Sequence, residues 1–294
     1  MRPPSANPAP PTGRPRRSAL YMPAANQRAM AKARDLPCDV VILDLEDAVA
    51  PEAKVDARQA ACATVAEGGF GSREVVIRIN GLSTEWGQAD LEAAAEARPD
   101  AILVPKIDGP GDLAPYAQAL PEGVALWAMV ETCQALFRLD ALGEAATAHG
   151  LTTLVAGTND LAKEMGCRLD AERAPLLAPL SLMVAAARAH GLVILDGVFN
   201  GIDDAQGLAR QCAQGEAFGF DGKTLIHPSQ IEAANRAFTP DPEAVDWARR
   251  VVEAFESPEN TARGVLRVEG RMVERLHLDQ ARRLLAIADA IAAA

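Results

Sequence analysis

The sequence predicts a (β/α)₈ barrel, a TIM barrel, followed by a C-terminal helical extension. Eight short apolar runs rich in Val, Ile and Leu alternate with Ala-rich segments whose apolar residues recur at intervals of three and four. A strand followed by a helix, repeated along the chain, predicts parallel strands, and near-continuous apolar runs are typical of strands covered on both faces. The 294 residues exceed the roughly 250 that this barrel typically needs.

The predicted elements follow one another at regular spacing. The strands are expected at Ala19–Met22, Val40–Leu43, Val75–Ile79, Ala101–Val104, Leu126–Val130, Thr153–Ala156, Val193–Leu195 and Gly222–Ile226. The helices are expected at Asn26–Arg34, Ala53–Val65, Thr84–Ala97, Leu113–Ala119, Leu136–Ala148, Leu176–His190 and Asp203–Gln214. An open doubly wound sheet is the alternative, but it usually has about five or six strands, and its GxGxxG fingerprint is missing.

The two ends of the chain differ from the barrel. Residues 1–17 hold six prolines, four arginines and no acidic residue, a composition that predicts a disordered extension rather than a secretory signal. The barrel is expected to occupy residues 18–238. Residues 239–294 predict a helix at Pro240–Ala254, an extended pair at Gly264–Val268 and Arg271–Val273, and a final helix at Asp279–Ala292. A segment of this size is too small for an independent domain, so we expect it to pack on its own barrel or on a neighbouring subunit.

Composition excludes several classes of partner. The formal net charge of −11 argues against a nucleic-acid or anionic-membrane surface, and no apolar run approaches the roughly 20 residues of a membrane span. Five scattered cysteines without a CxxC pair are typical of reduced thiols, and they make a zinc site improbable. We therefore predict a cytoplasmic protein.

Polar residues follow almost every predicted strand, where barrel enzymes place their chemistry. In strand order they are Asp44, Glu46 and Asp47; Arg78 and Asn80; Pro105 and Lys106; Glu131; Asp160; Asp196; and His227. Each has a structural alternative. Thr158, Asn159 and Asp160 could all cap a helix that starts near Leu161. Glu131 lacks this explanation, because Thr132 is the better cap and a lone buried Glu is rare.

The type of these side chains predicts the chemistry. By the alternation of a strand, Arg78 shares a face with Val76 and Asn80, and it must meet anions in the barrel mouth to recover its desolvation cost. A purely structural ion pair is the alternative. Oxygen ligands without nearby His or Cys favour Mg²⁺ or Mn²⁺, and Mg²⁺ usually takes one or two protein carboxylates. Glu131 and Asp160 would be these ligands.

The remaining acidic residues of the mouth would act around the ion. Asp44, Glu46 and Asp47 would hold its water ligands. Arg78 would neutralise a substrate carboxylate or an enolate oxygen.

Six segments in order carry a resemblance to a known family: LYMPAANQRAMAKA, DVVILDLEDAVAPEAKVDAR, VVIRING, ILVPKID, MVET and GTNDLA. Together they closely resemble the citrate lyase β-subunit-like branch of the HpcH/HpaI aldolase superfamily, over nearly all of residues 18–294. The resemblance implies a TIM barrel that binds Mg²⁺ and cleaves malyl-CoA, citramalyl-CoA, citryl thioesters or relatives into an acyl-CoA and a small 2-oxo acid. It also implies a homotrimer or hexamer whose C-terminal tail reaches a neighbour's site.

The resemblance also implies roles for individual residues. Catalytic roles fall on Arg78, Asp47 and Glu274; substrate contacts on Arg78, Glu131, Thr158 and Asn159; the coenzyme A channel on Tyr21, Pro105 and Lys106; and the metal on Glu131 and Asp160.

Two positions depart from relatives. Asp47 stands where the pyruvate aldolases have a histidine base, which places the chain with the CoA-ester lyases. Glu274 stands where the family commonly has an aspartate.

The resemblance leaves alternatives open. These are an aldolase acting on free 2-oxo acids, a citrate lyase β subunit acting on an acyl-carrier protein, hydrolysis of the thioester, and a non-catalytic binding protein.

Overall fold

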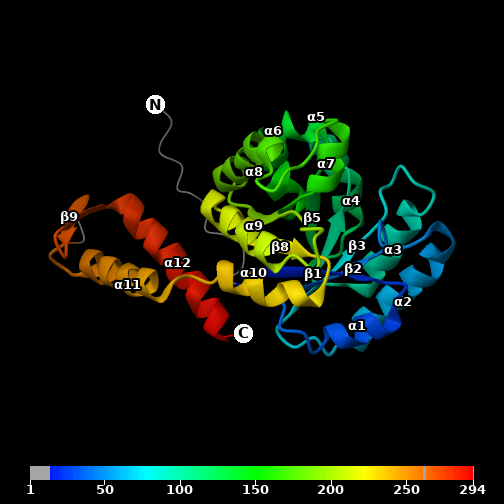
Figure 1. Cartoon of the computed structure of the whole chain (residues 1–294), viewed down its shortest axis with the longest axis horizontal. Coiled ribbons are helices and arrows are strands. Elements are labelled where there is room, and N and C mark those ends of the chain that lie inside the picture. The colour runs from blue at the N-terminus through cyan, green and yellow to red at the C-terminus, as the bar shows by residue number, and fades with distance from the viewer. Residues whose placement is uncertain (1–13, 261–262, 294) are drawn as a thin grey trace. The chain divides into compact units, whose positions relative to one another are not determined.

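The computed structural model describes residues 14–260 and 263–293, and the larger of its two compact units is built on a closed eight-stranded barrel (Figure 1). The strands are β1 (Ser18–Pro23), β2 (Val40–Asp44), β3 (Glu74–Arg78), β4 (Ala101–Val104), β5 (Ala125–Val130), β6 (Leu151–Ala156), β7 (Val193–Asp196) and β8 (Gly222–Leu225). Each strand pairs in parallel with its neighbour in sequence, and β8 pairs with β1 to close the ring. The predicted TIM barrel is confirmed.

Helices surround the barrel (Figure 1). In this part of the chain they are α1 (Gln27–Ala33), α2 (Lys54–Glu67), α3 (Gly87–Ala97), α4 (Leu113–Ala119), α5 (Cys133–Leu136), α6 (Leu139–His149), α7 (Thr158–Glu164), α8 (Leu177–Ala189), α9 (Ala205–Phe218) and α10 (Ile231–Ala237). Helix α7 starts three residues earlier than expected, directly after Gly157. Its first turn therefore contains Thr158, Asn159 and Asp160.

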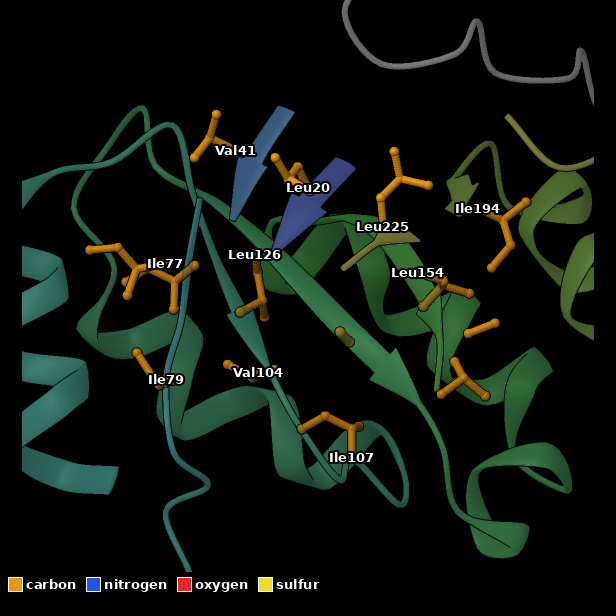
Figure 2. Packing of buried hydrophobic residues seen from close by; sticks show 14 of the residues in the cluster. Leu20, Val41, Ile77, Ile79, Val104, Ile107, Leu126, Leu154, Ile194 and Leu225 are labelled. Atoms are coloured by element: carbon orange, nitrogen blue, oxygen red, sulfur yellow. The ribbon is translucent and has the colours of Figure 1, made fainter. Parts of the chain in front are cut away.

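The strands bury two separate apolar layers because successive side chains point to opposite faces. One set, which includes Leu20, Val41, Ile77, Leu126 and Leu154, packs between the sheet and the helices (Figure 2). The other set fills the barrel interior and includes Ile42, Val76, Trp127, Val155 and Leu195. A polar residue at the end of a strand therefore faces the barrel mouth or the helix layer according to its place in this alternation.

The extension predicted at residues 1–17 is too long by at least two residues, because Arg16 and Arg17 belong to the barrel. Arg16 is buried, and its guanidinium donates to both carboxylate oxygens of Glu74 at 2.6 and 2.8 Å. Arg17 pairs with Asp39 at 2.7 Å. Composition alone favoured disorder here, because two arginines at the edge of a proline-rich segment gave no sign of their distant acidic partners. Residues 1–13 lie outside the described part of the chain.

A second compact unit begins at Thr239. It contains α11 (Pro242–Glu256), the antiparallel strands β9 (Val265–Val268) and β10 (Arg271–Glu274), and α12 (Arg275–Ala293). Its own small core includes Val251, Phe255, Leu266, Val273 and Leu278. The final helix starts four residues before the expected Asp279. Within residues 14–260 and 263–293, no helix has the length and apolarity needed to cross a membrane.

Candidate active site

A cavity of about 270 Å³ lies at the carboxyl ends of the barrel strands. Its lining includes eight of the predicted site residues: Tyr21, Asp44, Asp47, Arg78, Glu131, Thr158, Asn159 and Asp160. They lie in the last residues of β1, β2 and β3 or directly after β2, β5 and β6, so the closure of the barrel brings together residues that lie far apart in sequence. We call this space the mouth cavity.

Arg78 is the basic residue that lines the mouth cavity. Its Nε and one terminal nitrogen donate to the two carboxylate oxygens of Asp44, both at 2.7 Å, and its other terminal nitrogen donates to Asp47 Oδ2 at 3.3 Å. The guanidinium also stacks on the ring of Tyr21, 4.6 Å from its centroid. Burial disfavours the charge, but Asp44, Tyr21 and Glu46 together outweigh it and raise the pKa of Arg78. The prediction that Arg78 meets anions in the mouth is confirmed.

Asp44 has a different set of partners from the one expected. Besides Arg78, its oxygens accept the backbone N–H groups of Glu46 and Ala48 at 2.9 and 3.2 Å. A carboxylate used in this way fixes the arginine and the start of the loop after β2. The predicted contact of Asp44 with a metal's water ligands stays a prediction.

Glu46 is a buried carboxyl with an incomplete set of partners. Its Oε2 lies 2.8 Å from an Arg78 terminal nitrogen without the geometry of a hydrogen bond. Burial raises the pKa of Glu46 to about 7 against the lowering effect of Arg78, and Asp47 and Glu131 raise it further. Glu46 is therefore the mouth carboxyl best suited to hold a proton near neutral pH.

Glu131 is 1% exposed at the end of β5, and the chain around it is shaped to fit it. Its Oε1 accepts the backbone N–H of Lys106 at 2.7 Å. Gly157 faces it from the next strand end, where a Cβ would lie only 2.5 Å from Glu131 Oε2. Burial raises the pKa of Glu131 to about 6, against the lowering effect of Lys106.

Asp160 does not cap helix α7, so the capping alternative is wrong. The N-cap of α7 is Gly157, which has no side chain to cap it. The Asp160 carboxylate instead accepts a hydrogen bond from Lys106 Nζ at 3.0 Å. Thr132, by contrast, caps α5 as expected, because its side chain accepts the N–H of Ala135.

A second cavity of about 270 Å³ is lined by the loops after β3 and β4. Pro105 and Lys106 line this second cavity together with Glu46 and Tyr116, whereas Tyr21 lines the mouth cavity. The three residues predicted for the coenzyme A channel are thus divided between two cavities.

Several lining residues were not singled out from the sequence. Met129 Sδ lies 3.6 Å from Arg78, and Thr224 lines the mouth cavity. Their place in the strand alternation could have identified both, because each faces the barrel interior. Asn200 exchanges amide hydrogen bonds with Asn159 at 2.9 and 3.3 Å, and nothing in the sequence signalled that pair.

Glu274 ends β10 in the second compact unit, where it is half-buried. Its backbone N–H donates to His277 Nδ1 at 2.9 Å. Its predicted catalytic role stays a prediction.

The donor chemistry of the mouth cavity fits a hard divalent cation. Glu131 and Asp160 supply carboxylate oxygens, and they already attract one cation, the Lys106 ammonium. Among residues 14–260 and 263–293, no set of three or more His, Cys, Asp or Glu side chains is arranged to hold a metal. Two carboxylates are nevertheless the usual protein share for Mg²⁺, whose other ligands are water and substrate.

Comparison with known proteins agrees with this site. The model of the HpcH/HpaI aldolase/citrate lyase family matches residues 17–228, and the chain belongs to that family. It is 49% identical to a (3S)-malyl-CoA thioesterase of Cereibacter sphaeroides over 95% of this chain and 96% of the relative. It is 31% identical to the mitochondrial citramalyl-CoA lyase of Rattus norvegicus over 94% and 87%. The structure of CitE from Mycobacterium tuberculosis with magnesium, acetoacetate and coenzyme A is similar, with TM-score 0.73, 30% identity, and coverage of 92% and 97%.

Proposed function

We propose that this protein is a Mg²⁺-dependent acyl-CoA lyase that cleaves a 3-hydroxyacyl-CoA of the malyl, citramalyl or citryl class into acetyl-CoA and a 2-oxo acid. The observation that carries the proposal is that Glu131, Asp160 and Arg78 all line one cavity at the barrel mouth. Two carboxylates and one guanidinium match a substrate that has oxygens for a cation at one end and a thioester at the other. Family membership and the citramalyl-CoA lyase relative support the same reaction.

Glu131 and Asp160 would hold the Mg²⁺, with Mn²⁺ as the alternative ion, and the bound ion would polarise the substrate hydroxyl and carboxylate. Arg78 would donate to the thioester oxygen, where negative charge grows as the enolate forms. Its two hydrogen bonds to Asp44 and its stacking on Tyr21 fix the guanidinium before the substrate arrives. Thr158 and Asn159 would contact the 2-oxo acid portion from the first turn of α7.

A carboxylate would start the cleavage by removing the hydroxyl proton. Asp47 is suited to this role because its side chain is 65% exposed beside Arg78. The electron pair of the broken O–H bond forms the new carbonyl, the C–C bond breaks, and its electrons pass to the enolate of acetyl-CoA. Protonation of the enolate carbon completes acetyl-CoA.

Hydrolysis of the thioester is a second candidate, favoured by the (3S)-malyl-CoA thioesterase relative at 49% identity. In that reaction water adds to the thioester carbonyl and the C–S bond breaks, which yields a hydroxy acid and free coenzyme A. Arg78 would serve both reactions, because the carbonyl oxygen gains negative charge in each.

An assay of the purified full chain with MgCl₂ and malyl-CoA, citramalyl-CoA or citryl-CoA separates these reactions. Cleavage yields a 2-oxo acid, measured as its hydrazone, without free thiol. Hydrolysis yields free thiol without a 2-oxo acid. Activity on the free CoA esters would also exclude a requirement for an acyl-carrier protein. Neither product from any of the three esters would overturn the proposed function.

We also propose that the protein is a cytoplasmic homotrimer or hexamer in which Glu274 acts in the site of a neighbouring subunit. The five free cysteines support a reducing compartment. The support for a shared site is that Glu274 follows a turn at Gly270 in a separate compact unit.

A mixing experiment tests the shared site. Glu131→Ala and Glu274→Gln proteins, each inactive alone, should regain partial activity after their subunits exchange, because some sites then contain both intact carboxylates. Full activity of Glu274→Gln by itself, or no recovery after demonstrated exchange, would rule out the shared site.

A further inference from the structure

The Lys106 ammonium occupies the space between three carboxylates that come from three different strand ends. Nζ lies 3.0 Å from Asp160 Oδ2, 3.8 Å from Glu131 Oε1 and 3.8 Å from Glu46 Oε1. Two of these oxygens belong to the pair that would hold Mg²⁺. The lysine and the metal ion would therefore compete for the same two carboxylates.

The backbone of Lys106 directs its side chain to this place. Its φ of 53° lies in the left-handed region, which is uncommon for a residue other than glycine. The hydrogen bond from its N–H to Glu131 Oε1 holds this conformation. The side chain itself is 51% exposed, so the ammonium can leave its position without disturbing the core.

We propose that Lys106 is a built-in counter-cation of the metal site, which neutralises Glu131 and Asp160 in the metal-free protein and must move aside when Mg²⁺ binds. The inference rests on the proposed metal site and adds a role for the lysine. Mg²⁺ sits about 2.0–2.1 Å from its oxygen ligands. An ammonium that stays within hydrogen-bonding distance of the same oxygens would be strongly repelled by the ion.

Glu46 is the acidic side chain toward which the ammonium moves. It is the third acidic neighbour of Nζ and is not one of the proposed metal ligands. Its Oε1 lies 3.8 Å from Nζ, while its Oε2 lies 2.8 Å from Arg78. Both Glu46 and Lys106 line the second cavity. The displaced ammonium can therefore move toward Glu46 on the side of the second cavity. Because the ammonium must first leave Glu131 and Asp160, Lys106 lowers the affinity of the site for the metal.

The test is calorimetric titration of chelator-treated protein with MgCl₂ and with MnCl₂, which needs no substrate. Lys106→Met keeps the Cβ, the side-chain length and the backbone N–H that binds Glu131, and removes only the charge. Groups around metal ligands change metal affinity by about 10- to 100-fold, and we expect Lys106→Met to bind both ions about tenfold more tightly than wild type. Lys106→Arg, which keeps a cation, should bind no more tightly than wild type.

Lys163→Met is the matched control, because it removes the same charge from an exposed position on the helix that carries Asp160. It should leave the dissociation constants within about twofold of wild type, because exposed charges are screened. A gain in Lys163→Met equal to that in Lys106→Met would overturn the proposal. So would an unchanged affinity in Lys106→Met, or no binding in either Lys106→Met or wild type.

Thermal unfolding gives an independent readout. Without metal, Lys106→Met should melt below wild type, because Glu131 and Asp160 lose their neutralising cation. With saturating MgCl₂, its melting temperature should rise more than that of wild type. An equal rise in both proteins would contradict the exchange. These results do not depend on turnover, so absence of lyase activity would overturn the proposed function and leave the counter-cation proposal to be decided by metal binding.

Discussion

Two clusters of opposite charges at the strand ends of the barrel differ in their surroundings. The mouth cluster (Asp44, Glu46, Asp47 and Arg78) opens to the mouth cavity through Asp44, Asp47 and Arg78. The wall cluster (Arg173, Asp196 and Lys223) lines neither cavity and has no solvent exposure at Asp196 or Lys223. Both clusters contain a strand-end aspartate bonded to an arginine at 2.7 Å. Burial and charge alone therefore do not identify a functional site.

The charged side chains of the wall cluster pair with one another. Asp196 accepts from Arg173 and Lys223, both at 2.7 Å, and Lys223 also donates to the carbonyl oxygen of Gly197 at 2.5 Å. Burial opposes the charge of Asp196, but Lys223 and Arg173 outweigh it and lower its pKa. Each cluster has one buried polar atom without a hydrogen-bond partner, a terminal nitrogen of Arg173 in the wall cluster and Glu46 Oε2 in the mouth cluster. The mouth cluster differs because its Asp47 side chain is exposed and because it lines a cavity.

The largest expected effect is a loss of activity when a residue of the mouth cavity is changed. Glu131→Ala should abolish activity while the protein stays folded, because it would remove a proposed metal ligand and little core packing. The measurements are turnover with MgCl₂, metal binding and far-UV circular dichroism. Full activity in this variant would show that Glu131 is not needed in the active site. Glu131→Gln serves as a second variant of similar volume and should be equally inactive.

At the wall cluster the largest effect should fall on stability. Removing one partner of a buried ion pair typically costs about 3–5 kcal/mol because the remaining charge is uncompensated. Asp196→Asn should lower the free energy of unfolding by about that amount, with kcat/KM of the folded protein close to wild type. Denaturant unfolding and steady-state kinetics measure the two quantities. A large loss of kcat at unchanged stability would place the wall cluster in the active site.

Arg78→Lys tests the mouth cluster more finely, because it keeps the positive charge and changes only the geometry of the donors. Lysine cannot make the two-pronged contact with Asp44 or present the same planar set of donors. By analogy with the loss of one oxyanion donor, kcat should fall by about 10²–10³-fold. A fall of less than about tenfold would mean that Arg78 orders the loop after β2 and does not stabilise the reacting oxygen.

The sequence was sufficient for the barrel and for most of the mouth cavity. Strand alternation places Arg78 on the interior face with Val76, and the same rule sends Asp196 to the helix layer with Ile194. Strand alternation could not place Lys106 among three carboxylates, because the position of its side chain depends on a left-handed backbone and on groups from three other strand ends. Arg16 was missed for a similar reason, since its partner Glu74 lies 58 residues away.

The smallest effect concerns pH, and the two clusters should respond in opposite directions. The folded-state pKa of Asp196 is lowered, so its contribution to stability is complete above the unfolded-state pKa of about 3.9 and is lost as pH falls through the folded value. The pKa of Glu46 is raised from 4.5 to about 7, so the folded state keeps a proton that the unfolded state has released, and stability falls as pH rises through that interval. Denaturant unfolding of chelator-treated protein from pH 3 to pH 8 at constant ionic strength measures both. Glu46→Gln should remove the decline in the free energy of unfolding between about pH 4.5 and 7 and leave its fall at acid pH unchanged. Asp196→Asn should weaken the fall at acid pH and retain the decline between about pH 4.5 and 7. If Glu46→Gln shows the same decline as wild type, Glu46 is ionised in the folded protein and the mouth cluster holds its charges as firmly as the wall cluster does.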